Sequence, residues 1–222
     1  MESQIPAETL ERIERCGVVA VLVVDEAAHA VPLAKALLDG GIDAMELTLR
    51  TPVAFEALEA IREQVPEMLP GVGTVLTPEQ AGEAAAAGAA FGVAPGLNPR
   101  VVRAAQQGGL PFAPGVATAS ELEAALELGC REVKFFPAEP TGGMAYLKSM
   151  AAPYTHLGVR FVPLGGLNPD NVRNYLSSSL VLAVGGSWIA PRDAIRQEDW
   201  AAIRNNAYQA RAIVDGLREA GG

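Results

Sequence analysis

The amino-acid sequence predicts an α/β fold, a (β/α)8 barrel formed by a single domain over residues 1–222, with an extra helix at the N-terminus. Three observations lead to this prediction. Short apolar runs alternate with Ala- and Leu-rich helical stretches, one strand-helix unit recurs along the chain, and no linker or change in composition marks a second domain. A doubly wound open sheet is the alternative, but no G-x-G-x-x-G motif opens a helix after any candidate strand.

The candidate strands are eight short apolar runs. A helical pattern lies between every neighbouring pair, which predicts parallel strands because a parallel pair needs a long crossover connection. Eight such units in about 200 residues match a compact barrel. The eight runs are residues 18–24, 44–49, 71–75, 91–94, 111–113, 132–136, 160–163 and 181–184.

The helices carry recognisable ends. Thr77 is a predicted N-cap, because Pro78 follows it directly and Gln80 stands at the third helical position, as in a capping box. Glycines at the ends of helical stretches suit the left-handed residue that terminates a helix. We expect that conformation at Gly41, Gly88, Gly108 and Gly129. Residues 7–15 form the predicted extra helix, and residues 199–220 a long terminal one.

The composition excludes several classes of protein. Half of the residues are apolar and 19% are charged, which is typical of a globular chain. A net charge of −9 argues against a nucleic-acid partner. The longest apolar run, residues 17–24, is too short to cross a membrane, and no signal peptide is recognisable, so we expect a cytoplasmic protein. Two cysteines and two histidines provide no metal-ligand spacing, and no metal is expected.

A lysine interrupts one of the predicted buried strands, in the stretch EVKFFPAE (residues 132–139). The chain has two other lysines, Lys35 and Lys148, and both lie in helical stretches where a solvated face explains them. Strand alternation places Lys134 and Phe136 on one face. We expect that face to point into the barrel, because the other face is apolar and must meet the helices.

Two explanations of Lys134 remain open at this point. It can form a structural ion pair with Glu46, although buried pairs often fail to offset their desolvation. Alternatively, desolvation disfavours the charged form of a lysine, and an uncharged amine forms a Schiff base with a carbonyl substrate.

The stretch AMELTLRT supplies the other polar groups. Glu46, Thr48 and Arg50 alternate with apolar residues and therefore share one face, near the C-terminal end where barrel enzymes carry their catalytic groups. Arg50 can bind a carboxylate by two parallel hydrogen bonds, and Glu46 can transfer protons. A half-exposed strand with a solvated face is the alternative, but it suits an antiparallel sheet better.

Paired glycines follow the last two predicted strands, at Gly165 and Gly166 and at Gly185 and Gly186. These two junctions are where barrels commonly bind a phosphate group. Backbone N–H groups approach a ligand closely where no Cβ intervenes, and a helix N-terminus adds a favourable dipole. Ser187 adds a hydroxyl group to the second junction.

Taken in order, the motifs ELTLRT, GVGTVLTPEQ, APG, EVKFFPAE, the GG after the seventh strand and GGSW resemble the 2-keto-3-deoxy-6-phosphogluconate (KDPG) aldolases. That family also includes 4-hydroxy-2-oxoglutarate aldolases, and the resemblance covers essentially the whole chain. It implies a class I aldolase without metal or cofactor, on a (β/α)8 barrel that is usually a homotrimer. The implied substrate is a small phosphorylated 2-keto acid, and the implied products are pyruvate and glyceraldehyde 3-phosphate. For 4-hydroxy-2-oxoglutarate the products would be pyruvate and glyoxylate.

The resemblance also implies a role for individual residues. Lys134 would be the Schiff-base lysine and Glu46 the general acid and base. Arg50 and Thr74 would hold the pyruvate carboxylate, and Pro95 and Phe136 would line the site. The phosphate would be held by Gly165, Gly166, Gly185, Gly186 and Ser187.

One residue departs from the family pattern. KDPG-cleaving members typically read P-T-G-G where this chain has Leu164 in P-L-G-G, so the hydroxyl for which the resemblance implies a substrate contact is missing. Relatives acting on the galactonate epimer carry an aliphatic residue there, which makes 2-keto-3-deoxy-6-phosphogalactonate the alternative substrate.

A phosphate-binding barrel isomerase or epimerase, or a non-catalytic sugar-phosphate sensor, would share the barrel without using the lysine.

Overall fold

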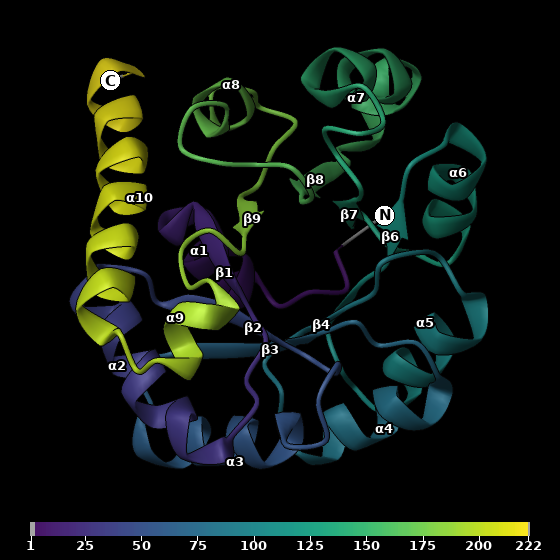
Figure 1. Ribbon diagram of the computed structural model, residues 1–222. Coiled ribbons are helices and arrows are strands. Elements are labelled where there is room, and N and C mark those ends of the chain that lie inside the picture. Colours follow the sequence, from purple (N-terminus) through teal and green to yellow (C-terminus); the bar gives the residue numbers. More distant parts are fainter. Residues whose placement is uncertain (1–2, 222) are drawn as a thin grey trace.

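The computed structural model describes residues 3–221, in which parallel strands form two curled, half-barrel sheets surrounded by helices (Figure 1). The first sheet has six strands in the order β5-β4-β3-β2-β1-β9, and the second has three in the order β6-β7-β8. The strands are β1 (Val18–Leu22), β2 (Ala44–Thr48), β3 (Leu69–Gly73), β4 (Gly92–Val93), β5 (Phe112–Ala113), β6 (Gly115–Val116), β7 (Glu132–Phe135), β8 (Arg160–Pro163) and β9 (Val184–Gly186).

The two sheets border each other at both edges. β5 and β6 belong to one stretch of chain and are separated only by Pro114, which has no N–H group to continue a ladder. At the other edge, Phe161 of β8 pairs in parallel with Val181, shortly before β9. Every ladder between the strands is parallel, as the alternating sequence pattern predicts.

Helices follow most of the strands and pack around them. In Figure 1, α2 to α8 and α10 lie outside the strands. No helix within residues 3–221 is long and apolar enough to cross a membrane. The helices are α1 (Ala7–Cys16), α2 (Ala30–Asp39), α3 (Ala54–Gln64), α4 (Pro78–Ala86), α5 (Pro99–Gln107), α6 (Ala119–Glu127), α7 (Gly143–Ala151), α8 (Val172–Leu176), α9 (Arg192–Arg196) and α10 (Trp200–Gly221), with 3-10 turns η1 (Ala27–His29) and η2 (Ala152–Leu157).

The predicted helix ends are confirmed with one exception. Thr77 caps α4, since its hydroxyl accepts a hydrogen bond from the N–H of Gln80 at 3.3 Å and the reciprocal bond completes the capping box. Gly41, Gly88 and Gly129 adopt positive φ angles. The prediction for Gly108 is wrong: its φ is −79°. The next residue, Gly109, takes the left-handed conformation with φ 71°, so the helical turn ends one residue later than expected.

The predicted strands are present, but several ends differ. The largest shift concerns the last strand, expected at 181–184 and observed as β9 over Val184–Gly186. The ladder with β1 begins at Val184 and continues through Gly185 and Gly186, whereas Val181 pairs with β8 only through an isolated bridge. The glycine pair therefore belongs to the strand itself rather than to the loop after it.

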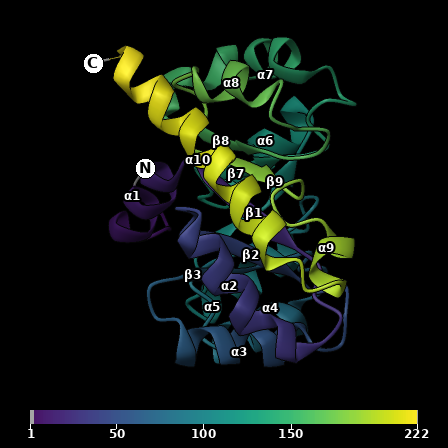
Figure 2. The same ribbon diagram turned by 60° about the vertical axis from the view of Figure 1, so that its left-hand side comes forward.

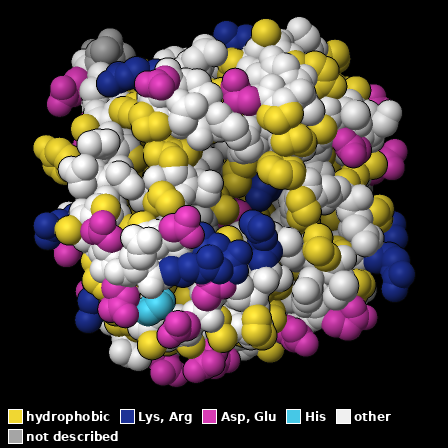
Figure 3. All heavy atoms as spheres, in the orientation of Figure 1, with side chains coloured by type: hydrophobic (Ala, Val, Ile, Leu, Met, Phe, Trp, Pro, Cys, Tyr) yellow, Lys and Arg dark blue, Asp and Glu magenta, His cyan; other side chains and the backbone are white. Residues whose placement is uncertain are grey.

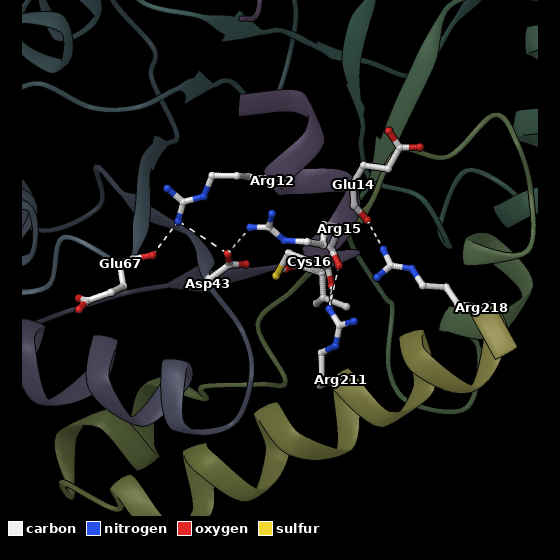
Figure 4. A network of polar contacts seen from close by, with 9 residues as sticks. Arg12, Glu14, Arg15, Cys16, Asp43, Glu67, Arg211 and Arg218 are labelled. Atoms are coloured by element: carbon white, nitrogen blue, oxygen red, sulfur yellow. Dashed lines mark hydrogen bonds and ion pairs between the residues drawn. The ribbon is translucent and has the colours of Figure 1, made fainter. Parts of the chain in front are cut away.

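The extra N-terminal helix is confirmed as α1, and it covers one end of the sheets. Figure 2 shows α1 on the side opposite α9. Figure 4 shows how it is attached: Arg15 binds Asp43 at 3.2 Å, and Arg211 and Arg218 of α10 donate to carbonyl groups in its last turn at 2.8 and 2.6 Å. These carbonyls have no partner inside the helix, so the arginines satisfy groups that would otherwise remain unpaired.

Candidate active site

Lys134 and Glu46 meet in the interior. Lys134 comes from β7 and Glu46 from β2, in different sheets, and their side chains are 7% and 3% exposed. The Lys134 Nζ atom lies 3.1 Å from Glu46 Oε1. Gly73 on β3 leaves room for the carboxylate, since an added Cβ would lie 2.7 Å from Glu46 Oε1. The prediction that both residues face inward is confirmed.

A cavity above this ion pair gathers most of the predicted site. It lies where β2, β3, β7 and β9 reach their C-terminal ends. The predicted residues that line it are Glu46, Arg50, Thr74, Pro95, Lys134, Phe136, Leu164, Gly165, Gly185 and Ser187. The face of the molecule in Figure 3 is hollowed near its centre, with Lys and Arg side chains beside the hollow.

Three residues of this cavity were not predicted as site residues: Val21, Val23 and Thr48. Thr48 was expected on the inward face of its strand, and its hydroxyl donates to the carbonyl of Leu22 at 2.9 Å, which ties β2 to β1. Val21 and Val23 form part of the wall. The same period-two alternation that selected Glu46 would have indicated them, because Val21 lies on β1 and Val23 follows two residues later, just past the strand end at Leu22.

The site around Lys134 contains an aromatic ring and a residue with an unusual backbone conformation. The Phe136 ring centroid lies 5.5 Å from Lys134 Nζ, within the range of a cation–π contact. Thr74 follows β3 with φ 60°, a left-handed conformation that is unusual for a residue other than glycine. Such backbone strain is concentrated at functional sites, where the surrounding structure enforces it.

The two pairs of glycines differ in what requires glycine: the backbone conformation at the first pair and close packing at the second. Gly165 and Gly166 have φ angles of 96° and 82°. Within residues 3–221, the N–H groups of these two glycines and of Ser187 donate to no protein acceptor. A Cβ on Gly185 would lie 2.3 Å from Leu164, and one on Gly186 would lie 1.9 Å from the Trp188 ring, so both positions exclude a side chain by close packing.

For two of the glycines the phosphate-site assignment stays a prediction. Gly166 and Gly186 are not among the residues that line the cavity, although they adjoin Gly165 and Gly185, which are. Neither glycine pair opens a helix, because α8 begins only at Val172 and α9 at Arg192. After the second junction, Arg192 and Arg196 of α9 hydrogen-bond Asp25, which follows β1, and hold the pKa of that carboxyl well below its usual range.

Leu164 lies at the boundary between the open cavity and a second, apolar cavity beneath it. It lines both and is 5% exposed. The second cavity also contains Glu46 and Lys134 in its wall, together with Ile5, Ile13 and other apolar residues. At the position of the family threonine the site thus presents methyl groups and no hydrogen-bond donor.

The cysteines lie apart from this site. Cys16 and Cys130 are buried and form no disulfide. Burial raises the pKa of Cys16 to about 11 and that of Cys130 to about 12, so both thiols are poor nucleophiles at neutral pH. Among the residues that the structure describes, no group of three or more His, Cys, Asp or Glu side chains could hold a metal ion.

Comparison with known proteins decides the family. The family model described as "KDPG and KHG aldolase" matches residues 10–206. The chain belongs to this aldolase family. The 2-dehydro-3-deoxy-phosphogluconate aldolase of Treponema pallidum is 48% identical over 92% of this chain and 96% of its own length. The KHG/KDPG aldolase of Escherichia coli K12 is 46% identical over 87% and 90%, respectively.

A solved structure adds chemical detail for a relative. The KDPG aldolase of Legionella pneumophila, with pyruvate captured at low pH as a covalent carbinolamine intermediate, superposes with a TM-score of 0.86. It is 40% identical and covers 91% of this chain and 97% of its own. The family resemblance and the aldolase function that the motifs predict are thereby confirmed.

Proposed function

We propose that the protein is a class I aldolase that cleaves 2-keto-3-deoxy-6-phosphogluconate to pyruvate and glyceraldehyde 3-phosphate through a Schiff base on Lys134. The observation that carries this proposal is the buried contact of 3.1 Å between Lys134 Nζ and Glu46 Oε1 at the base of an open cavity. The covalent pyruvate adduct of the Legionella relative supports the same chemistry.

The proposed reaction begins with imine formation. The uncharged amine of Lys134 attacks the C2 ketone, giving a carbinolamine, and Glu46 supplies the proton with which the C2 hydroxyl leaves as water. The protonated imine then withdraws electrons while Glu46 accepts the proton of the C4 hydroxyl. The C3–C4 bond breaks, its electron pair moves into the enamine of pyruvate, and the aldehyde departs. Protonation of the enamine carbon and addition of water release pyruvate and regenerate the amine.

Substrate binding would divide between the two sides of the cavity. Arg50 and Thr74 would hold the pyruvate carboxylate, while Pro95 and Phe136 would line the reacting carbons. The phosphate would accept hydrogen bonds from the N–H groups of Gly165, Gly166 and Ser187, which have no acceptor within the described protein. Gly185 and Gly186 would serve this site by allowing Leu164 and Trp188 to pack closely.

The identity of residue 164 leaves alternative substrates within the proposal. Leu164 offers no hydrogen bond to a substrate hydroxyl, which favours the galactonate epimer as a second substrate. The unphosphorylated 4-hydroxy-2-oxoglutarate, which would give pyruvate and glyoxylate, requires only the lysine, glutamate and carboxylate-binding groups. No step of this chemistry needs a metal or an organic cofactor.

The proposal extends to architecture and assembly. We propose that the two sheets are parts of one closed (β/α)8 barrel in a single domain over residues 1–222. The shared stretch around Pro114 and the pairing of Phe161 with Val181 support closure at both edges. A homotrimer in the cytoplasm, without nucleic-acid or membrane partners, is proposed from the family resemblance and the acidic composition.

Borohydride trapping tests the Schiff base directly. The protein is incubated with pyruvate, reduced with sodium borohydride, digested and mapped by mass spectrometry. We expect one reduced pyruvyl adduct, on Lys134. Lys134→Met should abolish the adduct and lower kcat/KM for the phosphorylated substrate by at least about 10^4-fold. Lys148→Met, a change at an exposed lysine of α7, is the matched control and should retain both.

Two results would contradict the proposal. Absence of an adduct on Lys134 in the parent protein would exclude the Schiff base. Retained turnover in Lys134→Met would instead favour a barrel enzyme, such as an isomerase or epimerase, that does not use the lysine.

A further inference from the structure

The segment that contains Leu164, Gly165 and Gly166 is attached to the loop after the lysine strand. The N–H of Ala138 donates to the carbonyl of Leu164 at 2.7 Å, and the N–H of Glu139 donates to the carbonyl of Gly165 at 3.0 Å. The loop that leaves β7 therefore continues the pairing of β7 with β8 beyond the ends of both strands. Any displacement of Glu139 would be transmitted to the glycines.

The side chain of Glu139 makes two further attachments. Its Cβ packs against Gly166, where an added methyl group would lie 2.7 Å away. Its carboxylate accepts a hydrogen bond from the hydroxyl of Tyr175 on α8, the helix that follows the same glycine segment. Tyr175 is fully buried, at 0% exposure. Burial and the Glu139 carboxylate raise the pKa of Tyr175, so the phenol keeps its proton and remains the donor.

The glycine segment is held through its carbonyl groups, while its two glycine N–H groups stay unpaired within the described chain. Gly165 and Gly166 both have positive φ angles, and glycine has more accessible backbone conformations than any other residue. Their N–H groups are directed to no acceptor within the described chain. A backbone that is to bind an anion in a fixed place must then be held from behind. Asn171 donates to the Gly166 carbonyl at 3.1 Å, and the Glu139 side chain, itself held by the Tyr175 hydroxyl, packs against Gly166.

We infer that Glu139 and Tyr175 form a clamp that sets the position of Gly165 and Gly166 relative to Lys134, and so determines the substrate length that the site accepts. The inference rests on the proposed function, in which Lys134 binds the keto carbon and the glycines bind the phosphate. Glu139 lies five positions after Lys134 in the chain, so the same loop fixes both ends of the substrate. The two residues act as positioning residues, through the glycine backbone rather than through contact with substrate.

The clamp predicts a selective kinetic defect. Tyr175→Phe removes only the hydroxyl group and should raise KM for 2-keto-3-deoxy-6-phosphogluconate about tenfold, with kcat little changed. The rate of borohydride trapping with pyruvate should stay at the parent value, because pyruvate carries no phosphate. Tyr154→Phe is the matched control: that hydroxyl also donates to a glutamate, Glu123, at 2.7 Å, but on the outer surface, and its loss should change neither measurement.

Variants of Glu139 test the clamp independently of Tyr175. Glu139→Ala removes the acceptor and the packing against Gly166 and should reproduce the rise in KM. Glu139→Gln keeps an oxygen acceptor of the same shape and should restore KM to near the parent value. A purely structural role would lower the melting temperature and slow pyruvate trapping and turnover together.

Equal losses in pyruvate trapping and in KM for the phosphorylated substrate would overturn the clamp, as would a Tyr175→Phe variant with unchanged KM. Failure of the parent protein to form any pyruvate adduct is a different result, since it would remove the proposed function on which the clamp depends.

Discussion

Two cavities, one at each end of the protein interior, share Lys134 and Glu46 as lining residues, but their other lining residues differ in polarity. Above Lys134 and Glu46, at the C-terminal ends of the strands, the cavity wall includes Arg50, Thr74 and Ser187. Below them, the wall of the second cavity is almost entirely apolar and includes Ile5, Ile13, Val19, Phe91, Val93, Val162 and Leu182. Along the same strands, the earlier inward-facing residues thus line an apolar core and the later ones line the reaction site.

The N-terminal segment accounts for much of the apolar end. Ile5 and Ile13 reach into the lower cavity, and the Ser3 hydroxyl donates to the buried Glu132 carboxylate at 2.7 Å. The arginine contacts of α1 hold this segment in place (Figure 4). The N-terminal segment therefore shelters Lys134 from water on one side, although it supplies no group to the chemistry.

Among the changes that distinguish the two ends, Glu46→Gln should give the largest effect, though smaller than the loss of Lys134. Glu46→Gln keeps the volume and a hydrogen-bonding group but removes the proton acceptor, so kcat should fall about 10^2–10^4-fold. Steady-state assay of pyruvate release measures it. Glu132→Gln is the matched control, a second buried glutamate that hydrogen-bonds Ser3, and its kcat should stay near the parent value. Similar losses in both variants would mean that the lower end also takes part in the chemistry.

Removing an anchor of the lower end should affect stability instead. Ile13→Ala leaves a void in a position that is 5% exposed and should lower the free energy of unfolding by about 2–5 kcal/mol. Urea denaturation gives this value, and kcat measured well below the transition should be unchanged. Ile213→Ala, at a half-buried position of α10, should be less destabilising. A fall in kcat of Ile13→Ala in the absence of denaturant would contradict the assignment of the lower end to stability alone.

The smallest change is expected at the boundary residue. Leu164→Thr introduces a hydroxyl at the position where the two cavities meet and should shift the ratio of kcat/KM for the gluconate and galactonate epimers about tenfold toward gluconate. Leu164→Val has nearly the same shape as the threonine variant and no hydroxyl, so it isolates the hydrogen bond. An unchanged epimer ratio in Leu164→Thr would show that residue 164 does not select the substrate.

Local patterns predicted the parts of the site that depend on local geometry. Alternation along a strand identified Glu46 and Lys134 as inward residues, because the pleat sets the side to which each points. Arg50 also lines the cavity, but it lies in the turn after β2, which ends at Thr48, so the pleat does not place it. Thr74 and Pro95 have no such signal and were expected only from the family resemblance. The end of β9 was misplaced because its ladder with β1 is a non-local pairing that apolar content does not fix.

The sequence by itself determined the alternation of strands and helices, the capping of α4 and the inward faces of Glu46 and Lys134, since these follow from backbone geometry over a few residues. Only the tertiary structure decided that Lys134 and Glu46, 88 positions apart, approach to 3.1 Å, and that the Glu139 carboxylate meets the Tyr175 hydroxyl. Such distances depend on how the sheets curl and how the helices pack against them, and no local preference specifies either.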